Sequence, residues 1–309
     1  MAAPTNIIKA TDIDGALSQE FIRNFNGEFD RLAEIFGIFG VSARAAGTAL
    51  YQYTVSGSLN NSAGYDASSG TSYIEGDEVA LSKYTVSKSS IGDLSPVPYR
   101  KMTTAKAIIQ DGYEKAVLAT DNKMVSQIRA QIINQFFAFL ENGTGAPDQS
   151  ATVNSLQKAL AYGDAALENA METNGDISSG RIVHFVSRND AADYLANATI
   201  TTQTAFGLTY LENFLGVENV FLTNKIDPGK VYITPAENIH AYGIDFGELS
   251  RGGLVYQVGS NGLIGVAHKG AYDYASAETN VMTGLQLIPE VLDYIVIADF
   301  GGTTTTTGA

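Results

Sequence analysis

The feature that most constrains this chain is a helical hydrophobic period that runs from residue 102 to residue 143. Apolar residues recur there at three- and four-residue steps and define one broad stripe, which is typical of a helix with a single buried face. The stripe consists of Val117, Met124, Val125, Ile128, Ile132, Phe136, Phe139 and Leu140. A continuous helix of this length would extend roughly 60 Å, which is more than a compact core requires and therefore favours an extended, flat molecule.

The same run also fits an ordinary pair of core helices. Gly112 is a candidate kink, and Asp121 is a candidate N-cap for a helix that restarts after a local break. Asn142 and Gly143 supply a C-terminal stop in either case. The two arrangements differ in the predicted length of the molecule and not in its helical content.

Composition excludes several classes of protein. With 309 residues, 45% of them hydrophobic, the chain can bury a sizeable core in one or two domains. The absence of cysteine excludes disulfides, thiolate metal sites and thiol nucleophiles. No apolar run is long enough to span a bilayer, and the first residues lack the basic and apolar regions of a signal peptide, so we expect a cytoplasmic protein without a membrane partner. The net charge of -14 argues against avid nucleic-acid binding and predicts that any DNA contact is local and independent of sequence.

An aromatic helix is predicted near the N-terminus. Its apolar positions, spaced at helical steps, are Leu17, Phe21, Phe25, Phe29, Leu32, Phe36 and Phe39. Such a stripe must be buried somewhere, either against its own domain or, as an arm, against a neighbouring copy. Both readings stay open, and the second makes Phe21, Phe25, Phe29 and Phe36 candidate interface residues.

A long hairpin follows the arm. Residues 50–55 and 77–88 alternate apolar and polar side chains as strands do. The tip between Ser56 and Gly76 is rich in Gly, Ser and Asn and cannot bury enough apolar surface to order itself. We therefore expect the hairpin to project outward and to dock Tyr65, Tyr73 and Ile74 against a neighbouring copy.

The second half of the chain predicts an α+β arrangement. The first expected elements are a helix from Leu156 to about Gly175, a strand at 181–187 and a helix over 191–197 that is capped by Asn189 or Asp190. Strands at 217–223 and 230–234 follow and are joined by a turn at 227–229. The chain is then expected to form a hairpin of 254–258 and 263–268, closing strands at 285–288 and 294–298, and a mobile tail.

Three features of the sequence resemble motifs for catalysis or for cofactor or metal binding, but each lacks a part that such a motif requires. The glycine-rich stretch 259–265 opens onto a strand and not onto a helix, so it is read as a hairpin turn and not as a nucleotide loop. Residues 12–15 resemble the start of a calcium loop but lack its bidentate Glu. His184, His240 and His268 have no metal-binding spacing and are read as structural. The sequence predicts no catalytic residue, no cofactor and no metal.

The order of these elements resembles that of tailed-bacteriophage major capsid proteins, whose fold is named after phage Hong Kong 97. The stretches that carry the resemblance are EGDEVALSKYTV, PYRKMTTAKAIIQDGYEKAV and FLGVENVFLTNKIDPGKVYITPAENI. The resemblance implies an N-terminal arm (1–46), an extended E-loop (47–98), a peripheral domain with a spine helix (99–147), an axial domain (148–253), and return strands of the peripheral domain with a C-terminal tail (254–309). Some relatives cross-link a Lys of the E-loop to a neighbour. Here Lys83 and Lys88 lie at the hairpin base, and that chemistry does not map onto them.

The resemblance also implies a function. It predicts a structural protein that self-assembles as hexamers and pentamers into the icosahedral head shell of a phage, around double-stranded DNA that it contacts non-specifically. Implied partners are a separate scaffolding protein, a portal and a decoration protein, and the implied locations are the virion and, during assembly, the cytoplasm of the bacterial host. Two alternatives remain: an encapsulin-type compartment with the same fold, and an acidic carboxylate-based hydrolase, for which the sequence shows no pair of catalytic acids.

Overall fold

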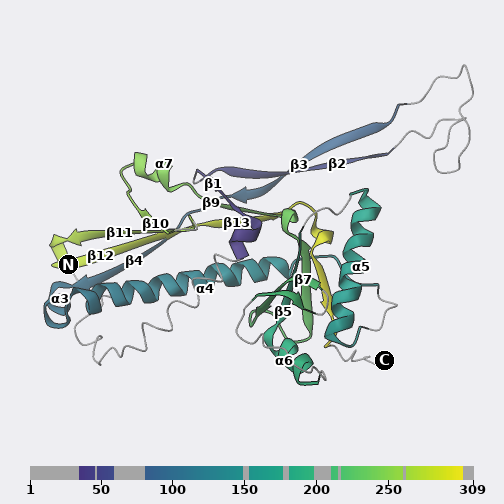
Figure 1. Cartoon of the computed structure of the whole chain (residues 1–309). Coiled ribbons are helices and arrows are strands. Elements are labelled where there is room, and N and C mark those ends of the chain that lie inside the picture. Colours follow the sequence, from purple (N-terminus) through teal and green to yellow (C-terminus); the bar gives the residue numbers. More distant parts are fainter. Residues whose placement is uncertain are drawn as a thin grey trace, which may run out of the picture.

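The computed structural model describes residues 35–45, 47–58, 81–148, 153–176, 181–197, 210–214, 217–259 and 262–301. They form an elongated body (Figure 1). A long helix runs along one side, a two-stranded hairpin projects beyond the body, and a five-stranded sheet flanked by helices forms one end. This is the extended α+β molecule that the sequence predicts. No helix among these residues is long and apolar enough to cross a bilayer.

The predicted long helix begins later than expected. Residues 102–104 belong to a strand, β4 (Val97–Thr104), and the first helix after it is α3 (Ala105–Asp111). The Thr104 hydroxyl caps α3 by accepting a hydrogen bond from the Ala107 N–H at 3.3 Å. Gly112 ends α3 with φ of 82°, so the predicted kink at this glycine is confirmed.

The helix then resumes as a π-helical turn, η2 (Glu114–Ala119), that leads directly into α4 (Thr120–Leu140). Asp121 therefore lies inside a helical segment, and the prediction that it caps a restarting helix is wrong. The reason is that residues 113–119 are already helical. The buried Asp121 side chain pairs with Lys101 instead.

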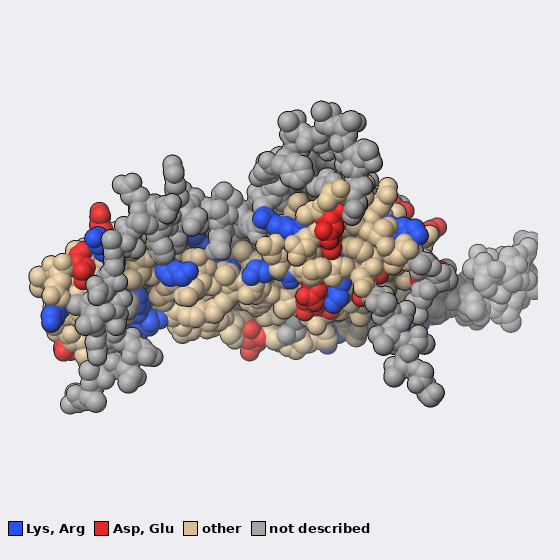
Figure 2. Space-filling model, turned by 90° about the horizontal axis from the view of Figure 1, so that it is seen from below, with Lys and Arg blue, Asp and Glu red and all other residues tan. Residues whose placement is uncertain are grey.

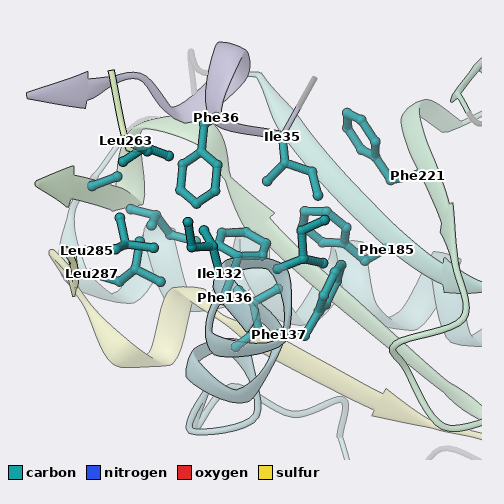
Figure 3. Packing of buried hydrophobic residues seen from close by; sticks show 14 of the residues in the cluster. Ile35, Phe36, Ile132, Phe136, Phe137, Phe185, Phe221, Leu263, Leu285 and Leu287 are labelled. Carbon is teal, nitrogen blue, oxygen red and sulfur yellow. The ribbon is translucent and has the colours of Figure 1, made fainter. Parts of the chain in front are cut away.

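The main core lies between α4 and the sheets and is built around phenylalanine (Figure 3). The ring of Phe136, which is fully buried, lies 5.8 Å from Phe36, 5.4 Å from Phe137 and 5.6 Å from Phe185, measured between centroids. Phe185 in turn stacks on Phe221 at 5.5 Å. These contacts join the N-terminal segment, α4 and two strands into one apolar unit.

Phe36 requires a correction. It was a candidate interface residue, but only 3% of it is exposed and it packs edge-on against Phe136 within its own subunit. Residues 35–39 are helical, and Ile35 is buried beside it. The end of the predicted aromatic helix therefore belongs to the subunit core, whereas Phe21, Phe25 and Phe29 lie outside the described residues.

The five-stranded sheet has the order β14-β8-β5-β7-β6. Its strands are β5 (Ile182–Ser187), β6 (Tyr210–Phe214), β7 (Val217–Thr223), β8 (Lys230–Pro235) and β14 (Val296–Asp299). Only the β5 and β7 pair is parallel, and the other neighbours are antiparallel. Helix α6 (Arg188–Asn197) follows β5, and α5 (Leu156–Asn174) packs on β8 and β14.

Close packing fixes α5 on this sheet. Gly163 faces the Ile233 side chain so closely that a Cβ atom there would lie 2.3 Å from its Cδ1 atom. The Ser155 hydroxyl caps the start of α5, and Gly175 ends it with φ of 77°. A second apolar cluster, which includes Leu160, Leu167, Val231, Ile233 and Val296, fills the space between.

Two smaller sheets complete the body. One has the order β1-β9-β13, formed by Val41–Arg44, Ile239–Ile244 and Leu285–Pro289. The other has the order β10-β11-β12-β4, in which β10 is Gln257–Val258, β11 is Ile264–Ala271 and β12 is Ser276–Thr283. The short helix α7 (Phe246–Arg251) connects the two sheets. The sequence analysis did not identify β1, β4, β9 or β12.

Most predicted elements of the second half are confirmed, with two differences. Helix α6 begins at Arg188, so Asn189 and Asp190 lie in its first turn and do not cap it. Asp190 instead accepts a hydrogen bond from the Gly229 N–H at 2.8 Å, which ties α6 to the predicted turn. Strand β14, expected among the return strands, pairs with β8 in the five-stranded sheet. Hydrogen bonding thus crosses the predicted boundary at residue 253, and the domain limits stay predictions.

The two faces of α4 give the first testable prediction. Ile132 is 3% exposed and faces the core, whereas Gln131 is exposed and its side-chain oxygen accepts a hydrogen bond from Tyr99. We expect Ile132→Asp to prevent folding, because a buried carboxylate without a partner costs more than the few kcal/mol by which a domain is stable. Gln131→Glu, the matched control, keeps an acceptor oxygen at the surface and should leave the circular dichroism spectrum and Tm nearly unchanged. Similar melts for both variants would contradict the assigned orientation of α4.

Candidate assembly surface on the hairpin

The hairpin consists of β2 (Ala49–Ser58) and β3 (Lys83–Asp93), which pair antiparallel. Its root is anchored in the body by Leu50 and Leu94, which are buried in a small cluster with Ile244 and Ile288. The Gln52 side-chain amide adds two hydrogen bonds, to the carbonyls of residues 289 and 290 at 3.1 and 3.0 Å. Beyond this root the two strands extend away from the body (Figure 1).

The register of the pair gives the hairpin two different faces. Tyr53 lies opposite Lys88, Val55 opposite Val86, and position 57 opposite Tyr84. Because side chains of directly paired residues point to the same side of a sheet, one face carries Tyr51, Tyr53, Val55, Tyr84, Val86 and Lys88. We call these six residues the apolar hairpin face.

The opposite face is polar throughout its described length. It carries Gln52 opposite Ser89, and Ser56 opposite Thr85. The Ser56 and Thr85 hydroxyl groups lie 3.2 Å apart across the strands. A register shift, in which position 91 has no partner, occurs between Leu50 and Tyr51, so the alternation of faces restarts at the root.

The apolar hairpin face is exposed to solvent. The exposed fraction is 63% for Tyr53, 64% for Val55, 56% for Tyr84 and 66% for Val86. Single exposed apolar residues are ordinary on a protein surface, but a contiguous set on one face of a two-stranded ribbon marks an interaction site. A ribbon of only two strands is also marginally stable alone, so this face is one that a partner surface would stabilise.

Lys88 gives this face a positive charge. Its Nζ atom lies 3.5 Å from the centroid of the Tyr51 ring and 5.8 Å from that of Tyr53, so the ammonium group covers aromatic surface while it stays in water. Lys83 lies on the opposite, polar face, opposite Ser58 at the end of the described strands that is distant from the root, so the prediction that it lies at the hairpin base is wrong. In a chain with net charge -14, a positive apolar ribbon favours contact with an acidic surface such as that of another copy.

The candidate interface residues of the hairpin tip, Tyr65, Tyr73 and Ile74, lie outside the described residues. The strands that carry the apolar hairpin face were predicted, but their exposed face was not identified as a surface. The signal was present in the sequence, since Tyr51, Tyr53 and Val55 alternate with polar residues on one strand and Tyr84 and Val86 do so on the other. What the sequence lacked was the register that places both sets on one side.

The three histidines each contact a carboxylate. The Nε2 atoms of His184, His240 and His268 lie 2.7, 3.0 and 2.8 Å from oxygens of Asp164, Glu290 and Asp121. Within the described part of the chain, no group of three or more His, Asp or Glu side chains is arranged to hold a metal ion. These pairs join separate elements of the fold, and their geometry is that of structural contacts.

Comparison with known proteins supports the architecture and not a close relationship. No protein-family model matches the chain. No curated protein matches it in sequence. Among solved structures, one of Mycobacterium phage Patience matches with a TM-score of 0.56 and 10% identity, over 97% of this chain and 95% of that chain.

Two further structures match to a similar degree. The capsid asymmetric unit of cyanophage A-1(L) has a TM-score of 0.55 and 13% identity, and covers 86% of this chain and 92% of that chain. The holo-SrpI encapsulin complex from Synechococcus elongatus has a TM-score of 0.58 and 11% identity, over 96% and 94% of the two chains. The chain therefore has the Hong Kong 97-like fold found in phage capsid proteins.

Proposed function

We propose that this chain is the major shell protein of a tailed-bacteriophage head, in which many copies enclose double-stranded DNA. The observation that carries the proposal is the apolar hairpin face, because it projects from the body and has no partner surface within the described part of its own subunit. The fold shared with phage capsid structures supports the same conclusion.

Assembly follows from the energetics of this face. Burial of an exposed Tyr or Val side chain contributes roughly 1.5–3 kcal/mol, and part of this is offset by the loss of side-chain freedom and by repulsion between acidic copies. Each contact is thus weak, and a closed shell is stable because every copy makes the contact with its neighbours in hexamers and pentamers.

The side of α4 that faces away from the hairpin is the proposed DNA side. Figure 2 shows several Lys and Arg side chains over the middle of this surface, with Asp and Glu side chains at its edge and over both end portions. On α4 itself, Lys123 is exposed and the only carboxylate, Asp121, is buried. Such a surface tolerates phosphate groups without binding them tightly, so the DNA contact is non-specific and sensitive to salt.

The further partners follow from the proposed role. Copies assemble in the cytoplasm of the bacterial host with a separate scaffolding protein and a portal, and a decoration protein binds the finished head. The mature protein resides in the virion. No membrane and no cofactor takes part.

An encapsulin-type compartment is the second candidate, because the encapsulin complex from Synechococcus elongatus shares the fold over 96% of this chain. The two functions predict different behaviour of the chain expressed alone. A compartment protein closes into uniform shells without help and encloses a protein cargo, whereas a phage head protein depends on its scaffold for a uniform size. Electron microscopy and the mass-spectrometric identification of contents separate the two.

Charge placed on the apolar hairpin face should prevent assembly without affecting the subunit. We expect Val86→Asp to leave the circular dichroism spectrum and Tm of the subunit unchanged, since the side chain is 66% exposed. In a shell the new carboxylate would be buried in an apolar contact, which costs several kcal/mol. Size-exclusion chromatography and electron microscopy should therefore show free subunits or small oligomers in place of shells.

The matched control is Ser89→Asp, which adds the same charge three residues away on the exposed polar face. It should still give shells. If both variants assemble, the apolar hairpin face is not a contact surface. If the wild-type protein forms no particle under any tested condition, the proposed function itself is wrong.

Assembly should also protect the hairpin backbone. In free Val86→Asp subunits, we expect amides of residues 51–58 and 83–90 to exchange with deuterium rapidly, because each strand has one unpaired edge. In wild-type shells the same amides should exchange at least ten times more slowly, while core amides of α4 change little. Equal exchange in both states would indicate that the hairpin strands make no contact with a neighbour.

A further inference from the structure

A lysine from a strand is inserted into the π-helical turn of the spine helix. Lys101 lies on β4 between β12 and the helix, and its Nζ atom donates to the Val117 carbonyl at 3.1 Å and to the Thr120 hydroxyl at 2.5 Å. The same ammonium group forms an ion pair with Asp121 Oδ1 at 2.5 Å. All three partners lie within or directly after η2.

The turn and its partners form one connected network. The Thr120 hydroxyl also contacts the carbonyl oxygens of residues 116 and 117, both at 2.9 Å. The second Asp121 oxygen, Oδ2, lies 2.8 Å from His268 Nε2 on β11. A π-turn replaces the usual hydrogen-bond pattern of an α-helix. Here the Lys101 ammonium group donates to the Val117 carbonyl, and the Thr120 hydroxyl contacts the carbonyls of residues 116 and 117.

This network is costly to bury. The side chains of Lys101 and Asp121 are 10% and 7% exposed. Burial lowers the pKa of Lys101, and the neighbouring Asp121 carboxylate only partly opposes this shift. Asp121 Oδ1 meets Lys101 as an ion pair and not through a well-directed hydrogen bond. Buried ion pairs of this kind contribute little to stability compared with apolar residues, and in some proteins they are retained because they select one conformation.

The chain next to the π-turn has room to change. Gly112 separates α3 from η2 with φ of 82°, and apart from its own chain neighbours no residue lies within 4 Å of the position a Cβ would take. A π-turn contains one more residue than the corresponding α-helical turn. Conversion of η2 to α-helix therefore requires that one residue move into the link at Gly112, and the link is open.

We propose that residues 112–121 form a two-state joint, in which the Lys101 ammonium group holds the π-helical register and its loss allows the α-helical register. The change would turn η2 by about 100° and shift it by about 1.5 Å relative to α4, and α3 would move with it because Ala107 of α3 is buried against Ala116 and Val117 of η2. The joint thus sets the direction of the end of the molecule that contains α3. This proposal does not depend on what the shell encloses.

Spin labels on α3 and α4 test the joint. The chain has no cysteine, so Ile109→Cys and Asn134→Cys introduce two unique sites, and both positions are exposed. Labelled copies diluted with unlabelled ones should give one distance population by pulsed electron spin resonance. We expect Lys101→Met to add a second, clearly separated population, because the Val117 carbonyl and the Thr120 hydroxyl lose the ammonium donor that ties the π-turn to β4.

Arg100→Met is the matched control. Arg100 is the neighbouring cation on β4, but its ion pair with Glu278 lies outside the joint and its side chain is 57% exposed. This variant should keep the wild-type distance. Hydrogen exchange adds a second readout: in Lys101→Met, amides of residues 114–121 should exchange at least tenfold faster, while those of residues 128–140 stay as in the wild type.

A double variant covers the case in which Lys101→Met alone does not fold, since that change leaves Asp121 buried with only His268 as its partner. Lys101→Met combined with Asp121→Leu removes both buried charges and should fold with a Tm near that of the wild type, yet show the second distance. An unchanged distance in every folded variant would overturn the joint. So would unfolding of both the single and the double variant, because Lys101 would then support the whole fold.

Discussion

The packing of Phe136 is the interaction on which the rest of the structure depends. Its ring contacts Phe36 from the N-terminal segment, Phe137 from its own helix and Phe185 from the five-stranded sheet. These segments are far apart in the sequence, so their association must offset the entropy of closing long loops. Large aromatic side chains do this efficiently, since each buries a large apolar area and gains from edge-to-face geometry. Tyr232, buried in the same core, has its pKa raised to about 12 by burial and by the nearby Glu141 carboxylate at the end of α4.

The described part of the hairpin is anchored to the body at its root. Leu50 and Leu94 are buried there, and three residues beyond Leu50 the Tyr53 side chain is already exposed to water. The free subunit therefore keeps apolar surface exposed, and the net charge of -14 limits unspecific association through it. Exposed apolar surface and like-charge repulsion act in opposite directions, which fits the proposed shell function, in which subunits stay dispersed until they associate through one defined surface.

The sequence predicted what depends on local periodicity. The stripe of α4, both strands of the hairpin, the kink at Gly112 and most elements after residue 155 were found, because each is encoded by spacing within one segment. The failures all involve partners distant in the chain. Asp121 was read as a cap because Lys101 and His268, which explain its burial, lie elsewhere in the sequence. Phe36 was a candidate interface residue because nothing in the sequence shows that Phe136 is its partner. Strand β9 was missed since its identity comes from β1 and β13 on either side.

The hairpin and the π-turn are connected by one continuous stretch of chain. Strand β3 of the hairpin leads through Leu94 into β4, which carries Lys101 into the π-turn. Between them Leu94 is 1% exposed and is fixed in a cluster with Leu50, Ile244 and Ile288. We therefore expect this anchor to limit how far a displacement of the hairpin is transmitted to β4. Because β4 is also paired along its whole length with β12, the register of the π-turn is decided locally by the Lys101 network. The proposed contact with a neighbour and the proposed joint therefore rest on separate groups of residues, with the buried cluster around Leu94 between them.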